Sequence, residues 1–231
     1  MGRINVSVWN ETPDQSGQKI TVTKLIYDNA ISGGNPNLPE VALTFDDGPS
    51  IYTPQVLTIL QRYGVNATFF PIGQNIAQFP AYLRQALAEG NAIGNHTFTH
   101  PNLRTLSAMS IYQELHEAQN SILHTTSTRP TVFRPPYGEY NADVLTASSQ
   151  LGMTFVTWSA GAEDWYNPQP SAEAIASHIL SAACNGAIFL LHEGGGNRAH
   201  TVAALPTIIT GLQARGFTLV TLPQMFAHLA K

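Results

Sequence analysis

Short apolar runs alternate with longer amphipathic stretches along most of the chain. In residues 53–63 apolar side chains recur at the spacing of a helix until Gly64, and residues 107–124 show the same spacing. Runs and helical stretches that alternate in this way predict parallel strands joined by helical crossovers. The seven runs that we predict as strands are residues 41–45, 67–70, 92–94, 132–133, 154–158, 187–191 and 218–220. This pattern fits a closed or incomplete barrel and an open doubly wound sheet equally well.

The first 38 residues have a different pattern. Residues 4–9 and 19–27 alternate apolar and polar side chains like the strands of a hairpin, and residues 32–37 are rich in Gly and Asn, as in a linker or loop. We therefore predict an N-terminal, hairpin-like extension over residues 1–38 and a larger domain over residues 39–231.

Composition and charge exclude several classes of protein. Of the 231 residues, 43% are hydrophobic and 11% are charged, which is the opposite of a disordered chain. The net charge is −4 without a basic cluster, so a nucleic-acid binder is not expected. The long uncharged stretches contain Pro, Gly and Asn, so we expect no membrane span. The single cysteine, Cys184, has alanine neighbours and is predicted to be buried.

Polar clusters follow the ends of five of the predicted strands. They lie at residues 46–50, 95–100, 134–138, 163–165 and 192–193. In a fold of parallel strands and helices, these ends meet at one rim, where such folds place their sites. The sequence therefore predicts one site built from several segments.

Asp46 and Asp47 are adjacent carboxylates at the end of the first predicted strand. In a poorly solvated rim they would repel each other unless a cation neutralises at least one of them. The alternative is a solvated turn in which the aspartates bond their own backbone, and for this motif taken alone the turn is the better interpretation.

His96 and His100 are four residues apart, so their imidazoles can converge. Two imidazoles and one carboxylate make a three-ligand site for zinc or a similar ion and leave one position open for water. Two loop histidines that only make hydrogen bonds would be an equal alternative. Together with the Asp-Asp segment, the metal site is the favoured interpretation.

Three further segments carry chemistry that has an ordinary alternative. Arg134 can pair with a carboxylate, or it can be a strand-end arginine facing water. His192 can be a core histidine, but the glycines that follow Glu193 favour a rim position, where an imidazole exchanges protons. Asp164 can orient a histidine beside Trp165, or the two can be a turn aspartate and a packing tryptophan.

These segments, in this order, resemble the five motifs of the polysaccharide deacetylases, carbohydrate esterase family 4. The matching residues are 44–50, 96–100, 134–138, 164–165 and 190–192, and the resemblance covers about residues 39–231. It implies an α/β fold, a distorted, incomplete (β/α) barrel with parallel strands, whose catalytic domain removes acetyl groups from glycans with the help of a metal. The chain departs from the family in having Glu193 where Asp is common.

The resemblance implies a role for each matching residue. One divalent ion, Zn²⁺ before Co²⁺ or Mn²⁺, would be held by Asp47, His96 and His100. Asp46 would be the general base and Arg134 would orient it. His192 would be the general acid, with Asp164 tuning its charge. The acetyl group would be bound by the backbone N–H of Tyr137 and by the side chains of Trp165 and Leu190.

The leading hypothesis is a hydrolase that removes N-acetyl groups from N-acetylglucosamine units of peptidoglycan or chitin-like glycans. It would cleave amide C–N bonds other than peptide bonds. An O-acetyl esterase acting on acetylated xylan and a non-catalytic glycan-binding protein are the alternatives. A glycosidase is disfavoured because adjacent Asp46 and Asp47 do not readily flank a bond at about 5–9.5 Å.

The family acts on glycans outside the cytoplasm, so the resemblance implies an extracellular, periplasmic or cell-wall location. The first residues show no signal-peptide pattern, and a fragment that begins after a removed signal would look the same. The expected partner is the glycan substrate, and the expected oligomeric state is a monomer.

Overall fold

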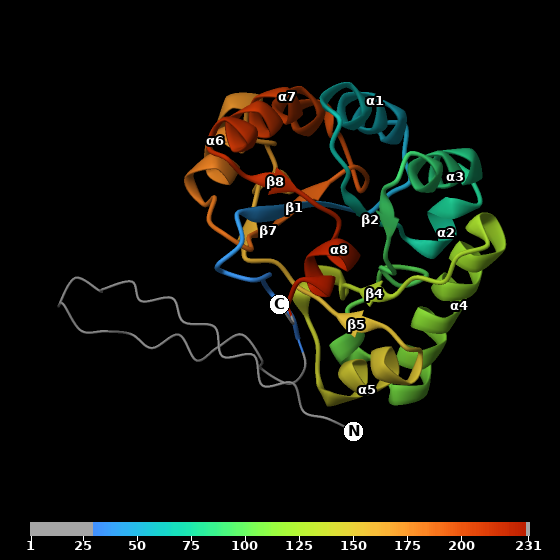
Figure 1. Cartoon of the computed structure of the whole chain (residues 1–231). Helices are drawn as coiled ribbons and strands as arrows, with labels where there is room; N and C mark the ends of the chain where they lie inside the picture. The colour runs from blue at the N-terminus through green and yellow to red at the C-terminus, as the bar shows by residue number, and fades with distance from the viewer. Residues whose placement is uncertain (1–29, 230–231) are drawn as a thin grey trace.

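The computed structural model describes residues 30–229, in which β-strands lie at the centre and helices surround them (Figure 1). The strands are β1 (Glu40–Asp46), β2 (Thr68–Phe70), β3 (Ala92–Ile93), β4 (Val132–Phe133), β5 (Thr154–Phe155), β6 (Ala160–Gly161), β7 (Ile188–His192) and β8 (Thr218–Leu219). The α-helices are α1 (Thr53–Tyr63), α2 (Gly73–Ile76), α3 (Pro80–Ala88), α4 (Ala108–Thr126), α5 (Ala142–Gln150), α6 (Ala172–Ser181), α7 (Ala199–Ala214) and α8 (Leu222–Ala227). Two short 3₁₀ helices cover Leu103–Thr105 and Pro136–Gly138.

All of these strands pair in parallel. The larger sheet has the order β3-β2-β1-β7-β6, and β8 pairs with the start of β1. β4 and β5 form a second, two-stranded sheet, and a parallel bridge between Asn95 and Phe133 connects it to the end of β3. The two sheets therefore form a distorted, incomplete (β/α) barrel, which confirms the predicted fold class over the open-sheet alternative.

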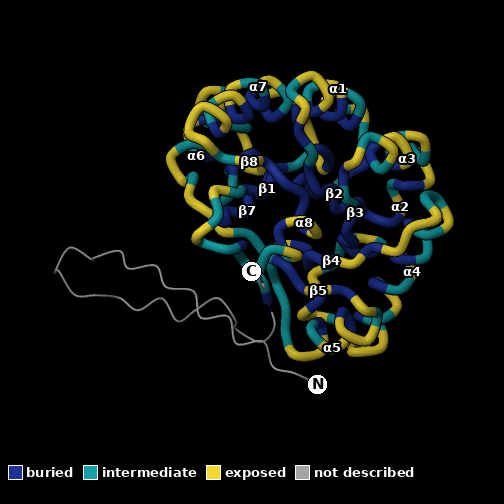
Figure 2. The backbone as a smooth tube through the Cα atoms, in the orientation of Figure 1, coloured by how far each residue is buried: buried dark blue, intermediate teal, exposed yellow. Residues whose placement is uncertain are grey.

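The alternating side chains of β1 pack on two sides. Val41, Leu43 and Phe45 belong to a core that includes residues of α1, α6 and α7. Ala42 lies on the other side, with Ile188 of β7 and with apolar residues of α8. Most strand residues are buried and the outer faces of the helices are exposed, as Figure 2 shows. The side of β1 that carries Ala42 thus faces the inside of the barrel, and the side that carries Val41 packs against the outer helices.

The predicted elements agree best with the structure where the apolar pattern is long. Helix α1 has the predicted bounds, and α4 begins one residue later and ends two residues later than residues 107–124. The strand predicted over residues 154–158 is too long, because β5 ends at Phe155. Beyond it Val156 forms only an isolated bridge with Ile31, whose carbonyl accepts from Thr157 N–H at 2.9 Å. β6 was not predicted, since Ala160–Gly161 is no apolar run. The prediction that Cys184 is buried is wrong, because it lies exposed after α6.

The described end of the predicted N-terminal extension lies along the barrel. Ile31 N–H donates to Phe155 O at 3.0 Å, and Gly33 forms a bridge with Ala187. The hairpin predicted within residues 1–29 lies outside the described residues, and the domain boundary at residue 38 stays a prediction. In the described part of the chain, every helix is too short or too polar to cross a bilayer.

Candidate active site

The carboxyl ends of the strands bring the predicted polar residues to one cleft. Asp46 ends β1 and His192 ends β7, and the two residues are paired across these strands. His96 follows β3 and Arg134 follows β4. The cleft has a volume of about 600 Å³. Its lining residues are Asp46, Asp47, Ile72, His96, His100, Pro135, Tyr137, Trp158, Trp165, Leu190, His192, Gly195 and Arg198.

Asp47, His96 and His100 converge on one side of this cleft. Each offers one ligand atom, and these atoms all lie within 4.8 Å of one another. Asp47 Oδ1 is 3.2 Å from His100 Nε2 and 3.5 Å from His96 Nε2. Spacings of this size leave room for an ion that contacts all three atoms at about 2.0–2.2 Å.

The hydrogen bonds around His96 show that these residues fit a cation. His96 Nδ1 lies 2.8 Å from Arg134 O, a carbonyl that only accepts, so this nitrogen carries the proton. In the neutral imidazole, Nε2 then presents a lone pair to Asp47 Oδ1 at 3.5 Å and to Asp46 Oδ2 at 3.7 Å. Asp47 Oδ1 is buried and receives no hydrogen bond from the described residues. A lone pair facing unpartnered carboxylate oxygens is the donor set of a metal site.

The charges in this group also shift the pKa values of Asp47 and His96. Burial alone would raise the pKa of Asp47, but the imidazoles of His100 and His96 outweigh it, so the pKa lies well below its usual range. Burial alone would lower the pKa of His96, but the charge of Asp46 and the contact with Asp47 raise it above its ordinary value. Both shifts favour a positive charge between these side chains.

The loop that carries the two histidines is held by side chains at both of its ends. Buried Asn95 accepts from Thr97 N–H at 2.9 Å and donates to Leu115 O at 2.8 Å. Glu114 of α4 accepts from Phe98 N–H and Thr99 N–H at 2.9 and 2.8 Å. These bonds satisfy the backbone of a loop without regular structure, so His96 and His100 are fixed before any ion binds.

Asp47 and His100 adopt backbone conformations that residues with side chains rarely adopt. Their φ angles are 70° and 63°, in the left-handed region. Such conformations persist only where surrounding contacts impose them, and they are frequent at functional sites. Here they turn both side chains toward the same point.

Asp46 and Arg134 form a buried ion pair beside the group formed by Asp47, His96 and His100. Arg134 Nη1 donates to Asp46 Oδ1 at 2.8 Å and to Thr44 Oγ1 at 2.7 Å, and its Nη2 donates to Thr157 O at 3.0 Å. Burial lowers the pKa of Arg134, and the charge of Asp46 partly offsets this, but a guanidinium remains protonated. The pair therefore fixes which of the two Asp46 oxygens faces the cleft.

His192 and Asp164 form a second pair across the cleft. His192 Nδ1 lies 2.8 Å from Asp164 Oδ1, and His192 N–H donates to Asp164 Oδ2 at 2.9 Å. Burial lowers the pKa of His192, but the hydrogen bond and the charge of fully buried Asp164 outweigh it and raise the pKa above its ordinary value. His192 is thereby prepared to hold a proton near neutral pH.

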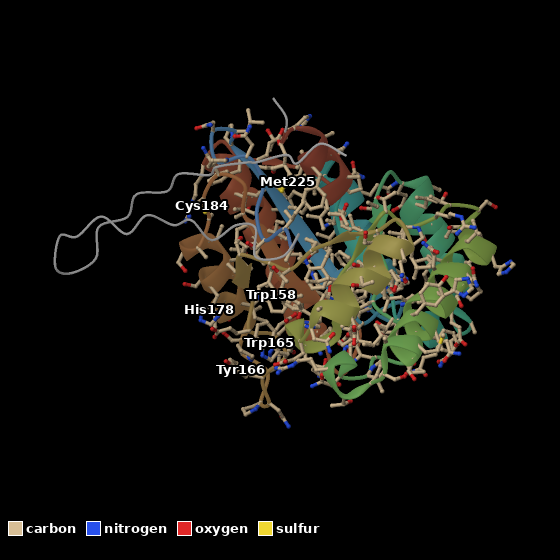
Figure 3. The ribbon with its side chains drawn as sticks, turned by 90° about the horizontal axis from the view of Figure 1, so that it is seen from below. Trp158, Trp165, Tyr166, His178, Cys184 and Met225 are labelled. Carbon is tan, nitrogen blue, oxygen red and sulfur yellow. The ribbon has the colours of Figure 1, made fainter. Side chains whose placement is uncertain are left out.

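Aromatic and apolar side chains make up the rest of the cleft. Trp165 packs edge-on against His192 with ring centroids 5.6 Å apart, and Leu190 of β7 is nearly buried beside it. The rings of Trp165 and Tyr166 lie 5.6 Å apart, centroid to centroid, and Figure 3 shows both residues below Met225. Tyr137, which is exposed, has its hydroxyl 3.2 Å from His100 Nδ1. These groups suit a ligand with a small apolar part and a sugar ring.

The glycines after β7 form a wall against Asp47. A Cβ at Gly194 would overlap the backbone carbonyl of Asp47, and one at Gly195 would overlap its carboxylate. Gly195 also has a φ of 71°. The backbone of this segment therefore approaches Asp47 as closely as glycine allows.

Glu193 is buried beneath the turn that follows Asp47. Its carboxylate accepts from Thr53 Oγ1–H, its carbonyl accepts from Ser50 Oγ–H, and burial raises the pKa of Glu193 to about 8. Glu193 is thus neutral at neutral pH and ties β7 to the start of α1.

This buried carboxyl predicts a pH dependence of stability. An unfolded glutamate titrates near pH 4.5, so between that value and about pH 8 the folded chain keeps a proton that the unfolded chain has lost. The free energy of unfolding should therefore be highest below pH 4.5, as far as this group is concerned, and fall as pH rises through 8. Urea unfolding of Glu193→Gln should lack this decrease, whereas Glu117→Gln, on the exposed side of α4, should keep it. An equal decrease in both variants would contradict the assignment.

Some residues of this region were not predicted from the sequence. Ile72, Trp158 and Arg198 line the cleft, and Thr201 of α7 donates to Asp164. Only the loop after β7 could be recognised as unusual from the sequence, because it contains a run of glycines. The direction in which the helical side chains point depends on how α7 packs.

The fold and the cleft define a class: a (β/α) barrel protein with an Asp-His-His group that can hold a metal ion, flanked by an arginine-paired carboxylate and a carboxylate-paired histidine. Residues 33–156 match the family model described as polysaccharide deacetylase. The chain belongs to this family. The family is metal-dependent, in agreement with the group formed by Asp47, His96 and His100.

Known relatives agree with this assignment. The chain is 39% identical over 198 residues to a chitooligosaccharide deacetylase of Bradyrhizobium sp., covering 80% of the chain and 90% of that protein. It is 36% identical over 189 residues to the peptidoglycan-N-acetylglucosamine deacetylase PgdA of Listeria monocytogenes, covering 81% of the chain but only 39% of that longer protein. The crystal structure of the Bc1960 peptidoglycan N-acetylglucosamine deacetylase superposes with a TM-score of 0.83 at 35% identity, covering 86% of the chain and 93% of that structure.

Proposed function

We propose that this chain is a metal-dependent hydrolase that removes N-acetyl groups from N-acetylglucosamine units of peptidoglycan or chitin-like glycans. The observation that carries the proposal is the combination, in one cleft, of the Asp47–His96–His100 group with the Asp46–Arg134 and His192–Asp164 pairs. The named activities of the relatives support the same substrate class.

Asp47, His96 and His100 would hold the ion. Two imidazoles and one carboxylate are a common ligand set of catalytic zinc, so we propose Zn²⁺. A bound divalent ion supplies two things here: a lower pKa for water and a polarised carbonyl oxygen.

The remaining residues would move protons and hold the substrate. Asp46, oriented by Arg134, would accept the proton of the attacking water, and His192 would give its proton to the departing amine. Asp164 keeps the His192 imidazole in the required tautomer through Nδ1. The acetyl methyl would lie between Trp165 and Leu190, and the backbone N–H of Tyr137 would donate to the developing oxyanion.

Because peptidoglycan and chitin lie outside the cytoplasm, the proposed site of action is extracellular, periplasmic or at the cell wall. The glycan is the proposed partner.

A substrate panel tests the proposal. Acetate release should be measured on a chitooligosaccharide, peptidoglycan and acetylated xylan, together with the metal content of the purified protein. We expect release from at least one N-acetylated glycan, its loss after chelation, and its recovery with Zn²⁺. Release from acetylated xylan alone would identify an O-acetyl esterase instead. A metal-loaded protein that binds these glycans and releases no acetate would be a non-catalytic binding protein.

A further inference from the structure

The first turn of α7 reaches back to the pair formed by Asp164 and His192. Arg198, the residue before the helix, donates from Nε to Gly194 O and from Nη1 to Asp164 O, both at 2.6 Å. Thr201, which is fully buried, donates from Oγ1 to Asp164 Oδ2 at 2.8 Å. One end of this helix thus contacts both the backbone and the side chain of Asp164.

The carboxylate of Asp164 receives three hydrogen bonds, one on Oδ1 and two on Oδ2. Oδ1 faces His192 Nδ1, while Oδ2 accepts from the backbone N–H of His192 and from Thr201 Oγ1. The torsion that rotates a carboxylate about its own axis is broad, so one bond to each oxygen defines its plane only loosely. Thr201 is β-branched and lies in a helix, where its side chain has few conformations. A stiff donor on Oδ2 therefore fixes the direction in which Oδ1 points.

We propose that Thr201 is a positioning residue. Its hydroxyl keeps the Asp164 carboxylate oriented toward His192 Nδ1, so that the opposite ring nitrogen of His192 faces the cleft. This inference rests on the proposed function only for the expected effect on kcat, because the contact between Thr201 and Asp164 can be tested without activity. Arg198 is the less informative residue to change, because its guanidinium also holds the glycine wall through Gly194 and Gly195.

A double-mutant cycle tests the inference. The values of kcat and KM for acetate release should be measured for the wild type, Thr201→Val, Asp164→Asn and the double variant, with Thr201→Ser as the matched control. Losing a hydrogen bond to a buried carboxylate should lower kcat of Thr201→Val about tenfold to a hundredfold. KM and metal content should stay unchanged, and Thr201→Ser should remain near the wild type. In the Asp164→Asn background, Thr201→Val should add little further loss, because the two residues act as one unit.

A spectroscopic measurement tests the same contact without activity. The His192 Nδ1–H proton, bonded to a carboxylate, should give a downfield NMR signal that is absent in Asp164→Asn. Thr201→Val should broaden or shift this signal, and Thr201→Ser should keep it. If Thr201→Val does not fold, Thr201→Ala replaces it in both experiments.

Three results would overturn the inference: a wild-type kcat for Thr201→Val, an equal loss in the Asp164→Asn background, or a Thr201→Ser variant as impaired as Thr201→Val. A wild type that releases no acetate from any substrate would refute the proposed function. The NMR signal would then still decide whether Thr201 positions Asp164.

Discussion

Replacing Asp46 with Asn is expected to lower the rate of acetate release by about 10²–10⁴-fold, the usual contribution of a general base. The amide has the shape of the carboxylate but cannot take a proton from water. Arg134 keeps partners in Thr44 Oγ1 and Thr157 O, so the cleft should retain its architecture. Rates of acetate release and zinc content should be measured on the same preparations.

The metal content is the decisive part of this experiment. Asp46 lies outside the group of three ligand atoms, so Asp46→Asn should bind as much zinc as the wild type. Asp143→Asn, an exposed substitution at the start of α5, is the matched control and should keep both the rate and the zinc. A fully active Asp46→Asn protein would refute the role of this residue. An inactive protein without metal would instead place Asp46 among the ligands.

Replacing His96 with Ala is expected to remove both the metal and the activity. The substitution deletes one of the three ligand atoms and leaves only those of Asp47 and His100. Activity should fall to the background of the assay, and elemental analysis should find less than one equivalent of zinc. His124→Ala, an exposed histidine of α4, should leave both quantities unchanged.

Partial rescue is a further expectation for His96→Ala. Excess zinc should restore some activity, since the substitution weakens binding without removing Asp46 or His192. A variant that keeps one tightly bound zinc and the wild-type rate would show that the ion binds elsewhere, and the proposed mechanism would then fail.

The sequence predicted the parts of the fold that depend on long apolar patterns. β1 and β7 are continuous buried runs, and α1 has a clear apolar side and a glycine stop, so their positions follow from local chemistry. β6 could not be found in this way, because Ala160 and Gly161 acquire strand geometry only by pairing with Phe189 and Leu190.

The location of the cleft followed from the sequence for a topological reason. Parallel strands bring their carboxyl ends together, so the polar residues after β1, β3, β4 and β7 had to meet. The structure places Asp47 with His96 and His100, Asp46 with Arg134, and His192 with Asp164. The chemical role of each residue remains a prediction until the variants are measured.

The contacts of Arg198 and Thr201 with Asp164 were beyond the reach of sequence patterns. Both residues lie in a segment whose spacing predicts only a helix, and their partner is more than thirty positions away. The left-handed backbone of Asp47 and His100 has a similar origin, because contacts from other segments impose it.

The close packing of Gly194 and Gly195 against Asp47 has a consequence for protein engineering. A run of glycines after a strand looks like a flexible segment suited to random mutagenesis. A larger residue at Gly194 or Gly195, however, would press on the backbone carbonyl or the carboxylate of Asp47. Libraries intended to alter glycan preference should therefore leave this stretch constant. They should diversify Ile51 and Tyr166 instead, whose side chains are exposed and are not among the residues that line the cleft.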